Sequence, residues 1–336
     1  MANFDSLVLT TEGISGGAVT VLMDNVDLPS FMVPFYKMNN KQLFGGSETT
    51  HPAFMIDGAE KDAFYASKYI NTVVDTRAYS WPNVIPSHSK NFDNEMSYCN
   101  NKGDGWHQMS IAEWAVIMHL IYKSGFIPRG NTNYGAHHEY TYEVGSKGSD
   151  ISGRTATGSG PATWCHDGLR TGIADFVGNL WKRLSGMRLV NGEIQVMVGN
   201  LPALQVSHAA SSTYWKAILA SDGSLVDPGT SGTLRVNSSG NIGTTAVTSG
   251  EFNKLFSDVV AADSIAIPEI VYALGLAPVS GVSTVGRFYG NLEGERIPLR
   301  GGSFGSLSGA GPSALYLSDA RSDAGSVVGF FSAYQK

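Results

Sequence analysis

Charged side chains are scarce in this sequence, and positive charge is not concentrated in any segment. Charged residues make up 15% of the 336 residues, the net charge is −6, and no cluster of Lys and Arg stands out. Binding to nucleic acid depends on concentrated positive charge that neutralises phosphates. We therefore expect no nucleic-acid partner.

Cysteines and long apolar runs are also scarce. Cys99 and Cys165 lie far apart and form no Cys/His pattern typical of zinc, so we interpret them as free buried thiols. No apolar stretch is long enough to span a bilayer, and residues 1–5 lack the basic start and apolar run of a secretion signal. We expect synthesis in a cytoplasm, no signal peptide and no membrane insertion.

Common signatures of catalysis are missing as well. The sequence contains no GxSxG elbow, phosphate loop or HExxH motif. Adjacent histidines such as His137 and His138 point to opposite sides of an extended chain, which makes them a poor metal pair. His166-Asp167 pairs a base with a carboxylate, but no nucleophile stands beside it in the sequence. We interpret these histidines as structural or exposed.

Glycine, by contrast, is abundant, with 40 residues. Together with many Ser, Thr and Asn residues, it favours turns and short strands over long solvated helices. The clearest helix is predicted from Ser110 to Gly125, because Ser110 and Glu113 have the spacing of a capping box. A second, shorter helix is predicted over 91–101. The sequence thus predicts an α+β fold with short strands, two main helices and long loops.

The remaining segments are assigned more coarsely. Residues 1–50 are interpreted as short strands and turns, and residues 54–74 as extended chain, although a helix is not excluded there. Asn191-Gly192 predicts a tight hairpin between strands at 187–190 and 194–198. Residues 200–285 have the composition of an insertion, with one helix expected over 249–261.

The C-terminal segment has an unusual residue composition. Between Arg296 and Tyr334 there is no Lys, Glu, Gln, Met or Trp, and small apolar residues alternate with small polar ones. Three short motifs frame it: Arg300-Gly301-Gly302, Ala320-Arg321-Ser322 and Val328-Gly329-Phe330. The absence of these five residue types is compatible with chance, with a buried Gly/Ser-rich strand, or with a surface whose side chains come from a restricted set.

The order of several motifs resembles the formylglycine-generating-enzyme branch of the C-type lectin fold. These motifs are Ser110-Ile111-Ala112-Glu113-Trp114, Gly178-Asn179-Leu180-Trp181, Arg300-Gly301-Gly302-Ser303-Phe304 and Gly329-Phe330, with Phe331 where Arg is usual. The resemblance covers about 51–200 and 286–336. It implies an attachment or oligomerisation segment at 1–50, a C-type lectin-like domain at 51–336 with an insertion at about 200–285, and a variable region at 300–330.

Within that branch, the segments 105–107, 128–135 and 158–164 resemble phage and prophage variable proteins that retroelements diversify. In such proteins, randomised adenines in Asn codons cannot produce Lys, Glu, Gln, Met or Trp. The resemblance implies these variable, ligand-binding positions: Ser303, Gly305, Ser306, Ser308, Gly309, Tyr316, Ser318, Asp319, Asp323, Gly325, Ser326 and Val327. It implies this invariant frame: Gly301, Gly302, Ala314, Leu315, Leu317, Ala320, Arg321, Ser322, Gly329 and Phe330.

The catalytic members of the branch need residues that this chain lacks. Their copper is bound by two cysteines near the C-terminal strand, whereas the last cysteine here is Cys165. The related sulfoxide synthases hold iron with an HxxxHxE pattern, which His137-His138-Glu139 does not match. Lys182 stands where the family usually has a calcium-binding Glu, so we expect a weakened or abolished calcium site. We predict no catalytic residues, no metal and no cofactor.

The resemblance therefore implies a non-enzymatic protein of a phage or prophage virion, on the tail or surface, that binds a bacterial receptor of protein or glycan. Contacts with other virion proteins and a homo-oligomer, such as a trimer, are expected, because multivalency strengthens weak single sites. A fixed lectin-fold structural or decoration protein of the virion is the alternative. A copper-dependent oxidase is a third interpretation, for which the residues are missing.

Overall fold

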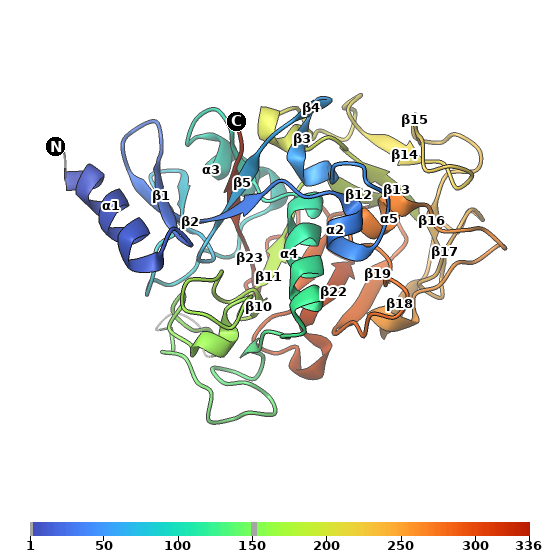
Figure 1. Cartoon of the computed structure of the whole chain (residues 1–336). Helices are drawn as coiled ribbons and strands as arrows, with labels where there is room; N and C mark the ends of the chain where they lie inside the picture. Colours follow the sequence, from blue (N-terminus) through green and yellow to red (C-terminus); the bar gives the residue numbers. More distant parts are fainter. Residues whose placement is uncertain (1–2, 149–152) are drawn as a thin grey trace.

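The computed structural model describes residues 3–148 and 153–336, and it has a mixed α+β fold of short strands, few helices and long loops (Figure 1). The α+β class predicted from the sequence is confirmed. The helices are α1 (Asn3–Ser15), α2 (Asn40–Phe44), α3 (Phe92–Asn100), α4 (Ile111–Ser124) and α5 (Glu269–Ala273). Short 3-10 turns occur at Pro52–Phe54, Ala162–Trp164, Leu201–Leu204, Phe256–Asp258 and Leu307–Gly309.

A five-stranded sheet joins the N-terminal and C-terminal parts of the chain. In spatial order it contains β1 (Thr20–Met23), β2 (Pro29–Tyr36), β5 (Ala63–Ser67), β24 (Ser332–Tyr334) and β8 (Trp106–Gln108). β2 pairs with β5 over five residues, and the Phe35 ring stacks on Phe64 with centroids 5.1 Å apart. Residues 1–50 therefore contribute directly to the same sheet and core as the following segment.

A six-stranded sheet carries most of the C-terminal segment. Its order is β18 (Glu251–Leu255), β19 (Arg287–Asn291), β22 (Gly311–Leu317), β21 (Leu299–Gly301), β11 (Trp181–Arg183) and β23 (Val328–Phe330). The third large sheet contains β15 (Leu225–Val226), β14 (Lys216–Ile218), β13 (Glu193–Val196), β12 (Met187–Val190) and β20 (Glu295–Arg296), with β16 (Arg235–Val236) and β17 (Ile242–Gly243) beside β13.

Three strand pairs complete the structure: β3 (Met55–Ile56) with β4 (Ala59–Glu60), β6 (Thr72–Val74) with β7 (Arg77–Tyr79), and β9 (Gly130–Asn131) with β10 (Val177–Gly178). The predicted extended segment over 54–74 is confirmed in part, because β3 to β6 lie within it. The hairpin of β12 and β13 has the predicted two-residue turn, with Val190 opposite Glu193.

Helix α4 runs through the middle of the molecule and is buried along most of its length (Figure 1). Its capping box forms as predicted: the Ser110 hydroxyl accepts from the Glu113 N–H, and the Glu113 carboxylate accepts from the Ser110 N–H. Gly125 ends the helix with φ of 74°. Trp114 stacks on Phe176 at 3.8 Å between ring centroids, which fixes α4 against the sheets.

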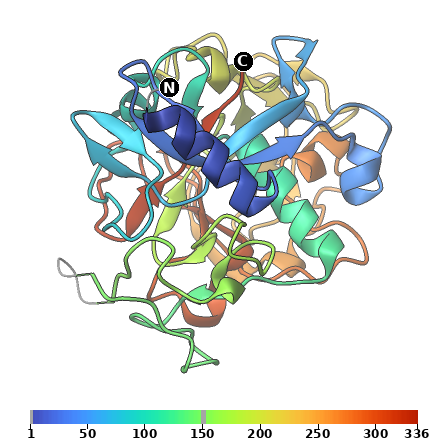
Figure 2. The same ribbon diagram turned by 60° about the vertical axis from the view of Figure 1, so that its left-hand side comes forward.

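Two local predictions were wrong. The first residues form helix α1, not strands and turns, and α1 lies on the outside of the molecule, across the front in Figure 2. Residues 249–261 form strand β18 followed by a 3-10 turn, not a helix. In β18 only Phe252 is buried and its neighbours face outward, so pairing with β19 decides the conformation.

Candidate binding surface

One face of the six-stranded sheet is packed into the core. The opposite face carries a small buried apolar cluster that includes Leu299, Ala314 and Val328, with polar and aromatic side chains beside it. Because side chains alternate along a strand, Phe252, Phe288 and Leu315 point into the core. Their neighbours in sequence lie on the outer face. The strand register places Asn253 beside Tyr289, and Tyr289 beside Tyr316. We call this side the outer face.

Three aromatic rings meet on the outer face. The Trp181 centroid lies 5.6 Å from Tyr316 and 6.2 Å from Tyr289, and the two tyrosine rings are 5.8 Å apart. Val327 packs against the same cluster from the loop before β23. Burial raises the pKa of both tyrosines, so their phenols are neutral hydrogen-bonding groups at physiological pH.

The twelve predicted variable positions differ in their exposure. Exposed are Gly305, Ser308, Asp323 and Ser326; half-buried are Ser306, Tyr316, Ser318, Asp319, Gly325 and Val327. Ser303 and Gly309 are buried. The alternating pattern does not apply to them, because this stretch forms a turn and a 3-10 helix instead of a strand.

Gly309 nevertheless links the loop to the outer face. A Cβ atom at this position would lie 2.6 Å from the Tyr289 hydroxyl and 3.4 Å from Arg287. The structure thus brings Gly309, Tyr316 and Val327 around one aromatic cluster, although they are distant in sequence. Gly305 lies elsewhere, near the Tyr134 ring.

Asp319 has a structural partner as well as partial exposure. Its carboxylate lies 3.2 Å from the guanidinium of Arg183, which is fully buried and also pairs with Glu95 at 3.2 Å. The same guanidinium donates to the backbone oxygen of Asp323. Replacing Asp319 would therefore remove one of the two carboxylates that balance a buried charge.

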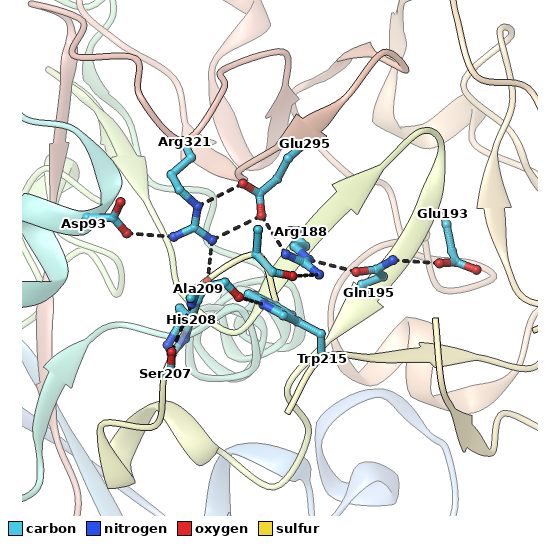
Figure 3. Close-up of polar contacts among 11 residues, drawn as sticks. Asp93, Arg188, Glu193, Gln195, Ser207, His208, Ala209, Trp215, Glu295 and Arg321 are labelled. Atoms are coloured by element: carbon cyan, nitrogen blue, oxygen red, sulfur yellow. Dashed lines mark hydrogen bonds and ion pairs between the residues drawn. The ribbon is translucent and has the colours of Figure 1, made fainter. Parts of the chain in front are cut away.

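Arg321, expected in the invariant frame, holds the 319–323 turn in place (Figure 3). It donates to Glu295, to Asp93 and to the backbone oxygen of His208. Glu295 also accepts from Arg188, whose guanidinium lies 4.4 Å from the Trp215 ring centroid. The network continues from Arg188 to Gln195 and then to Glu193, as Figure 3 shows.

This network joins the 319–323 turn to helix α3, to the β12–β13 hairpin and to the 207–215 loop. Burial alone would raise the pKa of Glu295, but hydrogen bonds and charges from Arg321 and Arg188 outweigh it and hold that pKa below its ordinary value. The Glu295 carboxylate is therefore ionised at neutral pH, and its ion pairs with Arg321 and Arg188 anchor the 319–323 turn.

Sequence reasoning missed a second exposed surface in the 132–148 loop. Tyr134, Tyr140 and Tyr142 are exposed there, with 76% of Tyr142 accessible. Buried Glu143 fixes the loop by accepting from Arg129, Thr163 and Trp164. In the sequence, the close spacing of three tyrosines in a polar loop would have indicated this surface.

The 132–148 and 303–309 loops lie at the same end of the molecule (Figures 1 and 2). Leu307 donates its N–H to Thr132, and Tyr134 donates its N–H to Phe304. Both Tyr134 and Leu307 are exposed and have positive φ, at 47° and 48°. Strained backbone of this kind persists only where surrounding contacts enforce it, and it is common at binding sites.

The histidines singled out in the sequence have partners within the protein. His137 Nδ1 accepts from the N–H groups of Glu139 and Tyr140, and His166 Nδ1 accepts from that of Ile173. Buried His107 is paired as well, with its Nε2 2.8 Å from the Glu113 carboxylate. These bonds place the imidazoles in structural roles. Within residues 3–148 and 153–336, no three His, Cys, Asp or Glu side chains form a group that could hold a metal ion.

Lys182, Asn179 and Cys165 are not arranged to bind a metal ion. Lys182 is fully buried, donates to the Gly178 carbonyl, and has its pKa lowered to about 7 by burial. Asn179 Oδ1 accepts from Thr155 and is not directed to an open site. The Cys165 thiol is buried with its pKa raised to about 11, so it is no thiolate at neutral pH.

None of the helices that the structure describes has the length and apolar character needed to cross a bilayer. No protein-family model and no curated protein matches the chain. Among solved structures, it is similar to Treponema denticola variable protein 1, with 10% identity over 95% of this chain and 99% of that chain, and a TM-score of 0.37.

The chain is also similar to the Major Tropism Determinant U1 variant, with 12% identity over 91% of this chain and a TM-score of 0.32. It spans 63% of that protein's length. PvdO from Pseudomonas aeruginosa matches at 12% identity over 94% of this chain and 98% of that chain, with a TM-score of 0.34. The structural neighbours thus include a tropism determinant and a variable protein.

Proposed function

We propose that this chain is a non-enzymatic receptor-binding protein of a phage or prophage virion. Its binding surface comprises the outer face and the adjoining 303–309 and 323–327 loops. The observation that carries the proposal is the aromatic cluster on the sheet beside Gly309 and Val327, in which half-buried Tyr289 and Tyr316 pack against buried Trp181. Rigid aromatic side chains next to small adaptable residues are typical of protein-binding and glycan-binding surfaces.

The ligand under this proposal is a receptor on the bacterial surface, and the predicted positions 303–327 adjust its recognition. Assembly into a homo-oligomer, such as a trimer on the virion tail or surface, would multiply a weak single-site affinity. Residues 1–50 would provide the contact between copies or with other virion proteins, since α1 is the most peripheral helix.

Cell binding tests the proposal. Fluorescently labelled protein is mixed with a panel of diverse bacterial strains and measured by flow cytometry. We expect binding to some strains, with a loss of about tenfold or more for Tyr316→Ser, as for an interface hot spot. Tyr36→Ser is the matched control, because Tyr36 is 64% exposed but lies on β2 of the other sheet. Binding to no strain, or equal losses in both variants, would contradict the proposal.

Diversification is tested separately by deep sequencing of the encoding gene across a population. Substitutions confined to the twelve predicted positions, at adenines of a near-identical template, are the expected result. Two observations favour the alternative, a fixed virion structural protein: Ser303 is buried, and Asp319 is paired with Arg183. A uniform sequence over 300–330 would support that alternative.

A further inference from the structure

A hollow of about 380 Å³ opens on the outer face beside the aromatic cluster. Strands β18, β19 and β22 form it, and β18 lies within the 200–285 segment, which has the composition of an insertion. The side chains that matter for its chemistry are Glu251, Asn253, Tyr289, Asn291, Tyr316 and Ser318. We call this feature the β18 hollow.

The strand register arranges these side chains in two rows. Glu251 lies opposite Asn291, and Asn253 lies opposite Tyr289, which is followed by Tyr316. The row of Glu251 and Asn291 is therefore polar. The other row leads from the Asn253 amide to the phenols of Tyr289 and Tyr316. All of these side chains lie on the face that points away from the core.

The polar groups of the β18 hollow are already oriented. Asn253 Oδ1 accepts from Arg287 Nε at 2.6 Å, so its amide nitrogen is left to act as a donor. Glu251 Oε1 accepts from Asn291 at 3.0 Å, which leaves the second carboxylate oxygen as an acceptor. A donor at Asn253 and an acceptor at Glu251 are therefore both available to hydroxyl groups, which donate and accept at the same time.

The aromatic groups supply the complementary contact. Tyr289 and Tyr316 are half-buried, with rings 5.8 Å apart at an angle of 53°. A tyrosine offers an apolar ring body and a polar hydroxyl tip. Pyranose rings have the matching character, because C–H groups form one surface and hydroxyls line the edge.

Charge and size restrict the ligand further. Glu251 is the charged side chain that lines the hollow, and its carboxylate disfavours an anionic ligand. The Arg287 guanidinium, which donates to Asn253, lies beside this lining and disfavours a strongly cationic one. The volume of the hollow lies within the range of small-molecule sites, and its lining combines polar groups with the side chains of Phe252, Tyr289 and Tyr316. We propose that the β18 hollow binds a short neutral oligosaccharide. The proposal rests on the proposed function, and it makes the bacterial receptor a surface glycan.

A glycan array tests the proposal directly. The purified full chain is applied to defined neutral and charged oligosaccharides, and hits are titrated by calorimetry. We expect binding to neutral glycans and about tenfold weaker binding for Asn253→Asp, the loss of one hydrogen bond. The aspartate still accepts from Arg287, so the fold is retained. Glu251→Gln is a second variant, with a similar loss expected because an amide cannot replace the carboxylate acceptor fully.

Asn94→Asp is the matched control, since Asn94 is an exposed asparagine on helix α3, away from the β18 hollow. Unchanged glycan binding in Asn253→Asp and Glu251→Gln would overturn the saccharide proposal, as would the absence of any neutral glycan hit. If cells are bound without any glycan hit, the receptor-binding function stands and the receptor is of another class. Glycan binding without cell binding would support the β18 hollow and overturn the receptor function.

Discussion

Two glycines in the C-terminal segment, Gly302 and Gly305, differ in whether they have room for a side chain. Gly302 has φ of 86°, and a Cβ there would lie 2.5 Å from Ala310. Gly305 has no positive φ, and the nearest atom to its Cβ would be the Tyr134 hydroxyl at 3.6 Å. The two residues are three positions apart, yet only one has room for a side chain.

We predict that Gly302→Ala lowers the free energy of unfolding by about 2–4 kcal/mol, the combined effect of a disfavoured backbone conformation and an overpacked neighbour. Gly305→Ala is its control and should change stability by less than about 0.5 kcal/mol. Urea unfolding followed by fluorescence measures both. Equal effects in the two variants would show that the loop does not distinguish frame from variable positions.

Glu295 is the residue on which the 319–323 turn depends most. Its carboxylate lies between Arg188 and Arg321, and its side chain is 19% exposed. We predict that Glu295→Gln lowers the free energy of unfolding at pH 7 by about 2–3 kcal/mol, because two partly buried guanidiniums then lack their shared anion. Glu293→Gln, an exposed neighbour, is the control.

The stability of the same variant should also depend on pH in a definite direction. The pKa of Glu295 is lower in the folded state than its ordinary value of 4.5, so its contribution is present above pH 4.5 and is lost as pH falls through the lowered pKa. The stability difference between wild type and Glu295→Gln should therefore be constant at neutral pH and shrink below 4.5. A difference independent of pH down to 2 would argue against an ionised Glu295.

Residue by residue, the sequence pattern explains the exposure of some predicted positions and not of others. Tyr316 and Ser318 face outward because they lie on or next to a real strand, where alternation holds. Ser303 and Gly309 are buried because their segment turns back on itself, and no alternation pattern describes a turn. The partners of Tyr316, namely Trp181 and Tyr289, come from distant strands, and no local pattern pairs them.

At the level of elements, prediction succeeded where the signal is local. The α4 capping box and the Asn191-Gly192 hairpin depend on residues a few positions apart, and both form. Strand β18 was missed because its conformation depends on β19, more than thirty residues away along the chain. Helix α1 was missed because its β-branched residues and Gly13 give it weak intrinsic propensity.

The α4 cap provides a test at this scale. We predict that Ser110→Ala lowers the free energy of unfolding by about 1–2 kcal/mol, because the Glu113 N–H loses its acceptor inside the protein. Ser97→Ala, an exposed change within α3, is the control and should be neutral or slightly stabilising. Chemical denaturation of both variants decides the matter, and a neutral Ser110→Ala would mean that another group satisfies this end of the helix.

For the whole molecule, strand pairing between distant segments determines the architecture. β24 lies between β5 and β8, so the C-terminal end of the described chain joins the same sheet as β1 and β2. β18 and β14 tie the 200–285 segment to the other two large sheets. The assignment of 51–336 as the lectin-like domain remains a prediction, whereas these pairings show that residues 1–50 share its hydrogen bonds and its core.

The final prediction concerns that boundary. A chain that starts at residue 51 would lack β1 and β2, which would expose the edge of β5 and remove Val33 and Phe35 from the core. We expect it to lose near-UV circular dichroism and to aggregate. A chain that starts at residue 17 lacks only the peripheral α1 and should keep a cooperative thermal transition, because β1 and β2 remain. Cooperative folding of the 51–336 chain, with a melting temperature within a few degrees of the full chain, would establish an independent domain and confine residues 1–50 to an attachment role.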